Sequence, residues 1–253
     1  MDTSERQQAI IALARAEGRV AVEALAARFE VSVQTIRKDL NQLCEQRVLS
    51  RVHGGAVLPS GVENLEYEAR RRIAAEAKSA IGRAAAGLIP NDASLFINIG
   101  TTTEAVGQAL TGHAGLLVVT NNINVANQMR VYPRFEVVIA GGVVRPSDGG
   151  IVGEAAADFF SQFKVDYAVI GASALDEDGA LLDYDYREVK VAQAIIANAR
   201  HVILVADAGK FARTAPVRIA RIGQIGSFVT DRCPSERFRS LCAEAGVALI
   251  ETG

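Results

Sequence analysis

The sequence predicts an α/β protein in two parts: a small, mainly helical N-terminal domain and a larger domain built on a mainly parallel sheet. Apolar residues recur at helical spacing before residue 58, whereas after residue 64 short strand-like runs alternate with helical stretches. Between them lies LPSGVEN, where Pro59, Ser60 and Gly61 interrupt both patterns. We therefore expect an N-terminal domain at residues 1–57, a linker at 58–64 and a C-terminal domain at 65–253.

Length and composition favour a globular protein. With 253 residues and 49% hydrophobic content, the chain can bury one large core or two moderate ones. Its 27 Lys and Arg residues are outnumbered by 29 Asp and Glu residues, so any contact with nucleic acid must come from a local basic patch. The polar start, and apolar runs that fall well short of ~20 residues, predict no membrane span and a cytoplasmic protein.

Three cysteines, Cys44, Cys233 and Cys242, form an odd set without the close spacing of metal ligands. They predict neither a disulfide framework nor a zinc site, and we interpret them as reduced packing residues. We expect no metal and no cofactor.

The N-terminal domain is expected to contain three helices. Their ranges are 4–18, 22–29 and 32–43. Ser4 and Ser32 are good N-caps for the first and third helices, because a serine hydroxyl accepts a hydrogen bond from the free N–H groups of the first turn. A sharp connection at Glu30 and Val31 joins the second helix to the third. This spacing is typical of a helix-turn-helix.

On the third helix, Ile36, Leu40 and Leu43 recur at i, i+4 and i+7 and are expected to face the core. The opposite face is then free to enter a DNA groove. Gln34 can pair with an adenine edge and Arg37 with a guanine or a phosphate, whereas Lys38 suits the DNA backbone as a point charge. The DNA-binding candidates on this helix are Ser32, Val33, Gln34, Thr35, Arg37 and Lys38.

A wing is predicted after the third helix, where the stretch VLSRVHGGAV offers two short strands around His53, Gly54 and Gly55. Arg47, Arg51 and His53 are expected to lie on this wing as further DNA contacts. Residues 32–57 carry a net charge of +2, while residues 58–253 carry −3. A solvated helix face or a protein-binding helical unit is the alternative. The cap, the tight turn and the wing together favour double-stranded operator DNA as the partner.

The C-terminal domain contains seven apolar runs typical of buried strands. They lie at residues 95–99, 116–119, 135–140, 166–171, 202–206, 227–230 and 247–250. Intervening helical stretches make a mainly parallel sheet the expected arrangement.

The first of these runs leads into Gly100, Thr101, Thr102 and Thr103 and then into an amphipathic helix. A helix N-terminus has unpaired N–H groups and a partial positive charge, and Gly100 lets the backbone approach a ligand. With three hydroxyls nearby, the stretch suits a phosphate group. The alternative is that a threonine only caps the helix.

Both parts of the chain resemble one known family. SVQTIRKDLNQL followed by RVHGGAV is similar to the winged helix-turn-helix signature of the DeoR family of bacterial transcriptional regulators, and the C-terminal part resembles that family's sugar-phosphate sensor domain. The resemblance covers nearly the whole chain. INIGTTTEAV, VVTNNINVANQM, AGGVVR with DGGIVGEAA, and DYDYREVK with RHVILVADAGKFAR are most similar to the members that control glycerol and glycerol-phosphate use. Ala14 departs from the usual Val or Leu, and Ala21 from a frequent Ser or Thr cap.

The resemblance implies a sensor domain with the fold of ribose-5-phosphate isomerases, in which ligand loops lie at the carboxyl ends of parallel strands. The effector-binding candidates are Gly100, Thr101, Thr102, Thr103, Asn121, Asn122, Gly141, Gly142, Ser173, Glu188 and Lys210. Lys210, in DAGKF, resembles the lysine that contacts phosphate in this fold. Arg145, Asp148, Glu188 and Lys190 are weaker candidates, for which surface ion pairs are an equal alternative.

An active isomerase would require a carboxylate base close to its substrate. The isomerases of this fold place acidic residues just after the fourth strand, but here residues 171–175 read GASAL and the first carboxylate is Asp176. Asp183, Asp185 or Glu188 could still fall in the pocket. We therefore expect a sensor that is not an enzyme, with that question left open.

By resemblance, the expected effector is sn-glycerol 3-phosphate, and the expected function is repression of genes for glycerol and glycerol-phosphate use until the effector releases the operator. One alternative is a regulator of the same build that answers a fructose or deoxyribose phosphate. Another is an active sugar-phosphate isomerase. Because operators of such proteins are usually repeated, we expect a homodimer or homotetramer.

Overall fold

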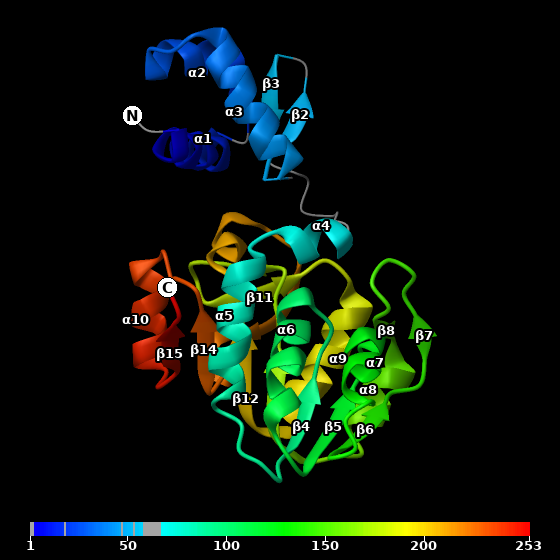
Figure 1. Ribbon diagram of the computed structural model, residues 1–253. Helices are drawn as coiled ribbons and strands as arrows, with labels where there is room; N and C mark the ends of the chain where they lie inside the picture. The colour runs from blue at the N-terminus through cyan, green and yellow to red at the C-terminus, as the bar shows by residue number, and fades with distance from the viewer. Residues whose placement is uncertain (1–2, 18, 47, 53, 58–66) are drawn as a thin grey trace. The chain divides into compact units, whose positions relative to one another are not determined.

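The computed structural model describes residues 3–17, 19–46, 48–52, 54–57 and 67–253 (Figure 1). The chain divides into two compact units, Met1–Leu65 and Glu66–Gly253, and each is described by itself. The expected linker at residues 58–64 and two DNA-binding candidates, Arg47 and His53, lie outside the described residues.

Three helices form the N-terminal unit, as expected. They are α1 (Thr3–Glu17), α2 (Val22–Phe29) and α3 (Val33–Glu45). Between α2 and α3 the backbone of Glu30 is left-handed, with a φ of 54°, and this residue makes the sharp turn. Ile36, Leu40 and Leu43 are buried in a core shared with α1 and α2, so the predicted inward face of α3 is confirmed.

The wing has one strand more than the sequence predicts. β2 (Ser50–Val52) and β3 (Gly55–Val57) form the expected hairpin, and β1 (Arg19–Ala21) pairs with the other side of β3. A Cβ on Gly55 would lie 2.0 Å from the carbonyl oxygen of Val20, so only glycine allows the two strands to approach. A strand of three residues is too short for its periodicity to be recognised in the sequence.

A seven-stranded parallel sheet forms the centre of the C-terminal unit (Figure 1). Its strands are β4 (Ser94–Ile97), β5 (Leu116–Thr120), β6 (Phe135–Ile139), β9 (Val165–Ile170), β12 (Ala199–Val205), β14 (Ser227–Thr230) and β15 (Ala248–Glu251). Each corresponds to one of the seven expected runs, and all the pairings between them are parallel. The predicted α/β class is confirmed.

The strand order is β15-β14-β12-β9-β4-β5-β6, so the direction of winding reverses between β4 and β9. The chain moves from β4 outward to β5 and β6, and then returns to β9 on the other side of β4. At such a reversal the loops that follow neighbouring strands diverge and open a crevice, which is where open α/β sheets bind ligands. The loops after β4 and β9 are therefore the expected location of a site.

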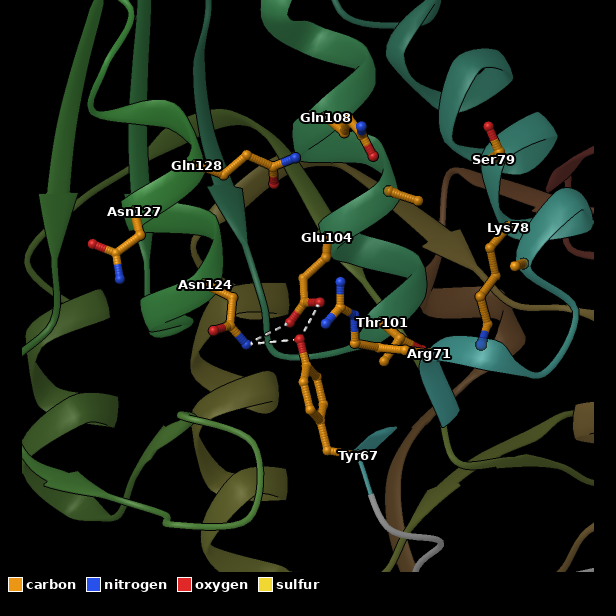
Figure 2. Close-up of a pocket in the computed structure, with 12 residues that line it drawn as sticks. Tyr67, Arg71, Lys78, Ser79, Thr101, Glu104, Gln108, Asn124, Asn127 and Gln128 are labelled. Carbon is orange, nitrogen blue, oxygen red and sulfur yellow. Dashed lines mark hydrogen bonds between the residues drawn. The ribbon is translucent and has the colours of Figure 1, made fainter. Parts of the chain in front are cut away.

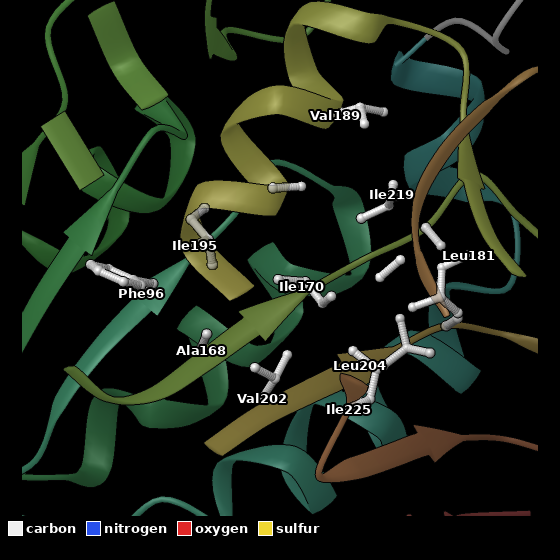
Figure 3. Packing of buried hydrophobic residues seen from close by; sticks show 14 of the residues in the cluster. Phe96, Ala168, Ile170, Leu181, Val189, Ile195, Val202, Leu204, Ile219 and Ile225 are labelled. Atoms are coloured by element: carbon white, nitrogen blue, oxygen red, sulfur yellow. The ribbon is translucent and has the colours of Figure 1, made fainter. Parts of the chain in front are cut away.

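Helices cover both faces of this sheet. One face is covered by α5 (Ala75–Ala86), α6 (Thr101–Ala109) and α7 (Ile123–Met129), and the other by α8 (Glu154–Phe160), α9 (Tyr186–Ala197) and α10 (Glu236–Glu244). Each face has its own hydrophobic core, the first beneath α5, α6 and α7 and the second beneath α8, α9 and α10. Side chains of β4 alternate between them: Leu95 and Ile97 belong to the first core and Phe96 to the second. Figure 3 shows part of the second core, in which side chains of α9, including Ile195, face those of the sheet.

Several short elements of the C-terminal unit are not expected from the sequence. They are α4 (Tyr67–Arg72), β7 (Val143–Val144), β8 (Ile151–Val152), β10 (Ala174–Leu175), β11 (Ala180–Asp183), β13 (Val217–Arg221), and the 3-10 helices η1 (Leu110–Gly112), η2 (Ala208–Ala212) and η3 (Ile222–Gln224). β10, β11 and β13 form a small antiparallel sheet. Within the described ranges, none of the helices is long and apolar enough to cross a membrane.

Candidate functional site

The outer face of α3 has the geometry that groove reading requires. Ser32 is the N-cap, and its Oγ accepts a hydrogen bond from the N–H of Thr35 at 3.1 Å. Ser32, Gln34, Arg37 and Lys38 are exposed, and Val33 and Thr35 are half-buried. Ser32, Gln34, Arg37 and Lys38 lie at the start of the helix and away from its buried face, whereas Val33, predicted to face the DNA, packs against the core.

Arg37 of α3 and Arg51 of the wing line one cavity of about 240 Å³, which Glu23 also lines. Two guanidinium groups on one surface can each contact a phosphate or a guanine edge. The recognition helix and the wing thus contribute to one surface, as in winged DNA-binding domains.

A buried ion pair connects α3 to α1. Asp39 is 2% exposed and accepts hydrogen bonds from Nε and Nη2 of Arg6 at 2.5 and 3.2 Å. Because Arg6 neutralises this carboxylate inside the unit, Asp39 adds little negative charge to the surface that carries Arg37 and Lys38.

Gly100 begins a cradle for an anion after β4. Its φ is 148°, a conformation that favours glycine, and among the described residues no side chain caps α6. The first N–H groups of α6 therefore remain available to a ligand, which argues against the alternative that a threonine only caps this helix. Thr103 Oγ1 lies 2.7 Å from the carbonyl oxygens of both Asn98 and Gly100, so this hydroxyl is not a free donor.

The loops after β4 and β9 enclose a cavity with this cradle. Of the predicted effector-binding residues, the structure brings Gly100, Thr101, Thr102, Thr103, Ser173, Glu188 and Lys210 together in its lining. Arg70 and Asp183 line it as well. The cavity volume is about 20 Å³, which is room for about one water molecule, so a larger ligand has to widen it.

Four basic side chains interact electrostatically with one another, and we refer to them as the cation cluster: Arg70, Lys78, Lys210 and Arg213. Of these, Arg70 and Lys210 line this cavity. Burial, reinforced by Arg213, lowers the pKa of Lys210 to about 7 against the attraction of Asp207. Burial also lowers the pKa of Lys78 to about 8. A doubly charged anion nearby would stabilise the charged form of these two buried lysines.

The same cavity is lined by groups that can bind hydroxyls. Ser173 Oγ donates to Asp183 Oδ2 at 2.9 Å, and Arg145 pairs with Glu188 at 2.6 Å. Burial and the nearby charge of Asp183 raise the pKa of Glu188, although Arg145 opposes the shift. These residues can exchange hydrogen bonds with a polyol.

Arg145 is the centre of a wider network. It forms ion pairs with Asp148, Asp185 and Glu188, and all four side chains are at most 17% exposed. For Arg145, Asp148 and Glu188, the alternative of a surface ion pair is therefore wrong. Lys190 does form a surface ion pair, with Glu154 at 2.9 Å.

Four candidates lie outside the lining of this cavity. Asn122 caps α7 by accepting a hydrogen bond from the N–H of Asn124 at 2.9 Å, and Asn121 donates to the carbonyl oxygen of Ile151 at 3.0 Å. Gly141 and Gly142 are exposed on the connection between β6 and β7.

Sequence reasoning missed three members of the cation cluster, Arg70, Lys78 and Arg213. Lys78 had a recognisable signal, because it lies on the buried face of α5 with Ile81 and Ala85 at i, i+3 and i+7. A lysine at a core-facing position usually has a functional or structural reason. Arg70 lies on the short helix α4, and Arg213 follows the 3-10 helix η2. The sequence carries no comparable pattern at either residue.

A winged helix-turn-helix unit, followed by an α/β unit with a polar cavity at its switch point, defines a two-domain DNA-binding regulator with a sensor domain. The chain belongs to the DeoR family: residues 6–62 match the DeoR-like helix-turn-helix domain, and residues 73–232 match the DeoR C terminal sensor domain. It is a DNA-binding transcriptional repressor.

Similar proteins include two that are each named glycerol-3-phosphate regulon repressor. The one from Escherichia coli (strain K12) is 47% identical over 92% of this chain and 93% of its own length. The one from Haemophilus influenzae is 48% identical over 92% of this chain and 91% of its own. Among solved structures, ribose 5-phosphate isomerase A from Methanocaldococcus jannaschii superposes with a TM-score of 0.41 and 13% identity over 54% of each chain.

Proposed function

We propose that this repressor controls genes for glycerol and glycerol-phosphate use, and that sn-glycerol 3-phosphate releases it from its operator. Two relatives with that regulon in their names are 47% and 48% identical to it over most of their lengths. Identity at this level over both domains supports a shared type of effector as well as a shared fold.

The observation that carries the proposal is the chemistry of the cavity. The free N–H groups of α6 after Gly100, together with Lys210, suit a phosphate dianion. Ser173 and Glu188 line the same cavity and suit hydroxyl groups. A small polyol phosphate combines these two requirements in one molecule.

We also propose that the cavity binds without turnover. Its two carboxylates, Asp183 and Glu188, come from β11 and α9 and not from the loop after β9. Both are already engaged, since Asp183 accepts hydrogen bonds from Ser173 and from the N–H of Tyr184, and Glu188 pairs with Arg145. A base must reach a substrate proton, and these existing hydrogen bonds would first have to be exchanged before either carboxylate could do so.

In this proposal the protein is a homodimer or homotetramer that acts in the cytoplasm on double-stranded operator DNA. Its exposed Gln34 and Arg37 read the groove, and Arg51 contacts the DNA backbone. If the effector weakens operator binding, the operator must weaken effector binding by the same factor, because coupling between two sites is reciprocal.

The test is a ligand panel at equal concentration: sn-glycerol 3-phosphate, glycerol, inorganic phosphate, fructose 1-phosphate, fructose 6-phosphate, deoxyribose 5-phosphate and ribose 5-phosphate. A ligand that binds only the folded state raises the melting temperature. We expect a selective increase with sn-glycerol 3-phosphate and, in a fluorescence anisotropy assay with operator DNA, release by the same compound.

Release no greater than that caused by inorganic phosphate would overturn the effector assignment. A selective response to another ester would keep the repressor and replace its effector. Conversion of ribose 5-phosphate in a coupled assay would overturn the proposal of binding without turnover.

A further inference from the structure

Arg70 has an incomplete set of hydrogen bonds at the wall of the effector cavity. Its Nη2 donates to Asp148 Oδ2 at 2.9 Å, but its buried Nε has no hydrogen-bond partner among the described residues. The side chain is 11% exposed and lines the cavity with the anion cradle. A buried donor without a partner is costly, and an acceptor atom of a ligand would complete its hydrogen bonds.

The helix that carries Arg70 is attached to its unit by polar contacts. Every residue of α4 is exposed or half-buried. Apart from the pair of Arg70 with Asp148, Tyr67 Oη donates to Glu104 at 2.7 Å, and Lys78 Nζ donates to the carbonyl oxygens of Arg70 and Ile73.

A cavity of about 370 Å³ lies where α4 meets α5, α6 and α7. Figure 2 shows Tyr67 hydrogen-bonded to Glu104 and Asn124 in its lining, with Lys78 extending from α5 toward α4. Polar contacts, and not a packed apolar core, join α4 to the other helices, so movement of α4 does not disrupt a core.

Arg70 and Lys78 hold α4, and both also belong to the cation cluster. A phosphate in the cradle would compete with Asp148 for Arg70, which lines the same cavity. Asp148 can lose Arg70 without being left unpaired, because Arg145 donates to it from Nε at 2.9 Å and from Nη2 at 2.7 Å. The exchange therefore leaves no buried carboxylate without a partner.

We propose that Arg70 is an effector-binding residue that exchanges Asp148 for the phosphate group of the ligand, and that α4 moves with it. This inference rests on the proposed function and names the device that regulates it. The cavity of about 20 Å³ widens as Arg70 turns. Along the chain, α4 is the first described element of the C-terminal unit, and the segment before it leads to the DNA-binding unit.

The first test is calorimetric titration of the full-length protein with sn-glycerol 3-phosphate. Arg70→Met is expected to weaken binding by about tenfold or more, because a charge-assisted hydrogen bond is lost. Arg70→Lys keeps a positive charge, so its affinity for the ligand should lie between those of Arg70→Met and the unaltered protein. If Arg70→Met does not fold, Arg70→Lys provides the test. Arg72→Met, on the exposed side of the same helix, is the matched control and should bind as the unaltered protein does.

Asp148→Asn separates a ligand contact from a purely structural role. The asparagine oxygen can still accept from Arg145 and from the N–H of Gly150, but it no longer holds Arg70 as an ion pair. If Arg70 must leave Asp148 to bind the phosphate, Asp148→Asn binds the ligand as tightly as the unaltered protein or more tightly. If Arg70 only anchors α4, both Arg70→Met and Asp148→Asn weaken binding, and that outcome overturns the proposal.

Movement of α4 can be followed directly. The sequence contains no tryptophan, so Arg72→Trp introduces a single fluorescent reporter on this helix. We expect saturating sn-glycerol 3-phosphate to shift its emission, and the shift to disappear in the double variant R70M/R72W. Ligand binding without any shift in R72W overturns the movement of α4. A failure of the unaltered protein to bind the ligand overturns the proposed effector instead, so the two failures are distinguishable.

Discussion

Lys210 is held close to the boundary between its charged and neutral forms. Burial lowers its pKa from the ordinary value of 10.5 to about 7, and Arg213 adds to this effect. A phosphate dianion beside it would stabilise the ammonium and raise the pKa again. Effector binding is therefore expected to take up a proton at and above neutral pH.

This coupling predicts an affinity for sn-glycerol 3-phosphate that is highest between about pH 6 and pH 7. Above pH 7 the free protein holds Lys210 increasingly as a neutral amine, so affinity falls by up to about tenfold per pH unit. Below about pH 6 the phosphate ester loses its second negative charge. Calorimetric titrations in two buffers of different ionisation enthalpy measure both the affinity and the proton uptake. An affinity that stays constant from pH 7 to about pH 9 would contradict the role of Lys210.

The same lysine should limit the stability of the free protein. Between pH 7 and 10.5 the unfolded chain binds a proton that the folded chain does not, so the contribution of Lys210 to the free energy of unfolding rises with pH in this window. Below pH 7 the unfavourable contribution is fully present.

Lys210→Met is accordingly expected to increase the free energy of unfolding by on the order of 1 kcal/mol near pH 6, and to abolish stabilisation by the effector. Thermal unfolding at about pH 6 and about pH 9 checks this prediction, and the gain should be smaller at the higher pH. An equal gain at both pH values would mean that packing, and not removal of the ammonium, causes it.

At the scale of elements, α3 depends on its first turn for both stability and contact with DNA. Ser32 satisfies the N–H of Thr35, and the exposed Gln34 and Arg37 follow directly. Changing Ser32 should therefore affect both the stability of α3 and its affinity for DNA, and different substitutions should separate the two effects.

Ser32→Ala is expected to cost about 1 kcal/mol and to speed hydrogen exchange of the α3 amides about fivefold, because it removes the cap. Ser32→Asp retains a capping oxygen and should keep normal exchange, but its negative charge should weaken operator binding. Exchange measured by mass spectrometry and affinity measured by anisotropy give the two readings. If Ser32→Asp bound DNA as tightly as the unaltered protein, the N-terminus of α3 would not lie near the DNA.

The elements that the sequence predicts correctly are those with long, consistent patterns. The inner strands of the parallel sheet are largely covered on both faces, so they contain uninterrupted apolar runs such as Leu95 to Ile97, whereas the edge strands β6 and β15 are more exposed. The helices α1, α2 and α3 have apolar faces, and Ser32 is the N-cap of α3 as predicted. Ser4, predicted to cap the first helix, lies inside α1, which begins at Thr3. The strands β7, β8 and β10 have two residues each, which is too few for any periodicity.

The site shows the same division. Gly100 to Thr103 and Lys210 could be found because each follows a recognisable strand, and parallel strands end at one edge. Asp183 and Arg70 could not be placed, because β11 and α4 reach the cavity through tertiary packing that no local pattern encodes. The sequence also could not show that Arg145 pairs with Asp148, Asp185 and Glu188, because it shows which residues are charged but not which of them are in contact.

At the scale of the whole molecule, the free energy that the effector can supply limits how the repressor is built. Nearly complete transfer from the operator-bound to the released state requires a difference of about 5.5 kcal/mol between the affinities of the effector for the two states. Coupling between two sites in one protein is typically about 1–3 kcal/mol. One small phosphate ester in one cavity therefore falls short, whereas two to four coupled cavities reach the required value.

We therefore expect the protein to sediment as a dimer or tetramer at micromolar concentration, and its release from operator DNA to follow effector concentration with a Hill coefficient above 1. Analytical ultracentrifugation with and without DNA gives the number of subunits, and anisotropy titrations give the Hill coefficient. Arg70→Met should lower effector affinity without changing the number of subunits, which separates sensing from assembly. A monomer that is fully released with a Hill coefficient of 1 would require a single cavity to supply the whole difference. In that case the polar attachment of α4 would have to transmit an unusually large free energy.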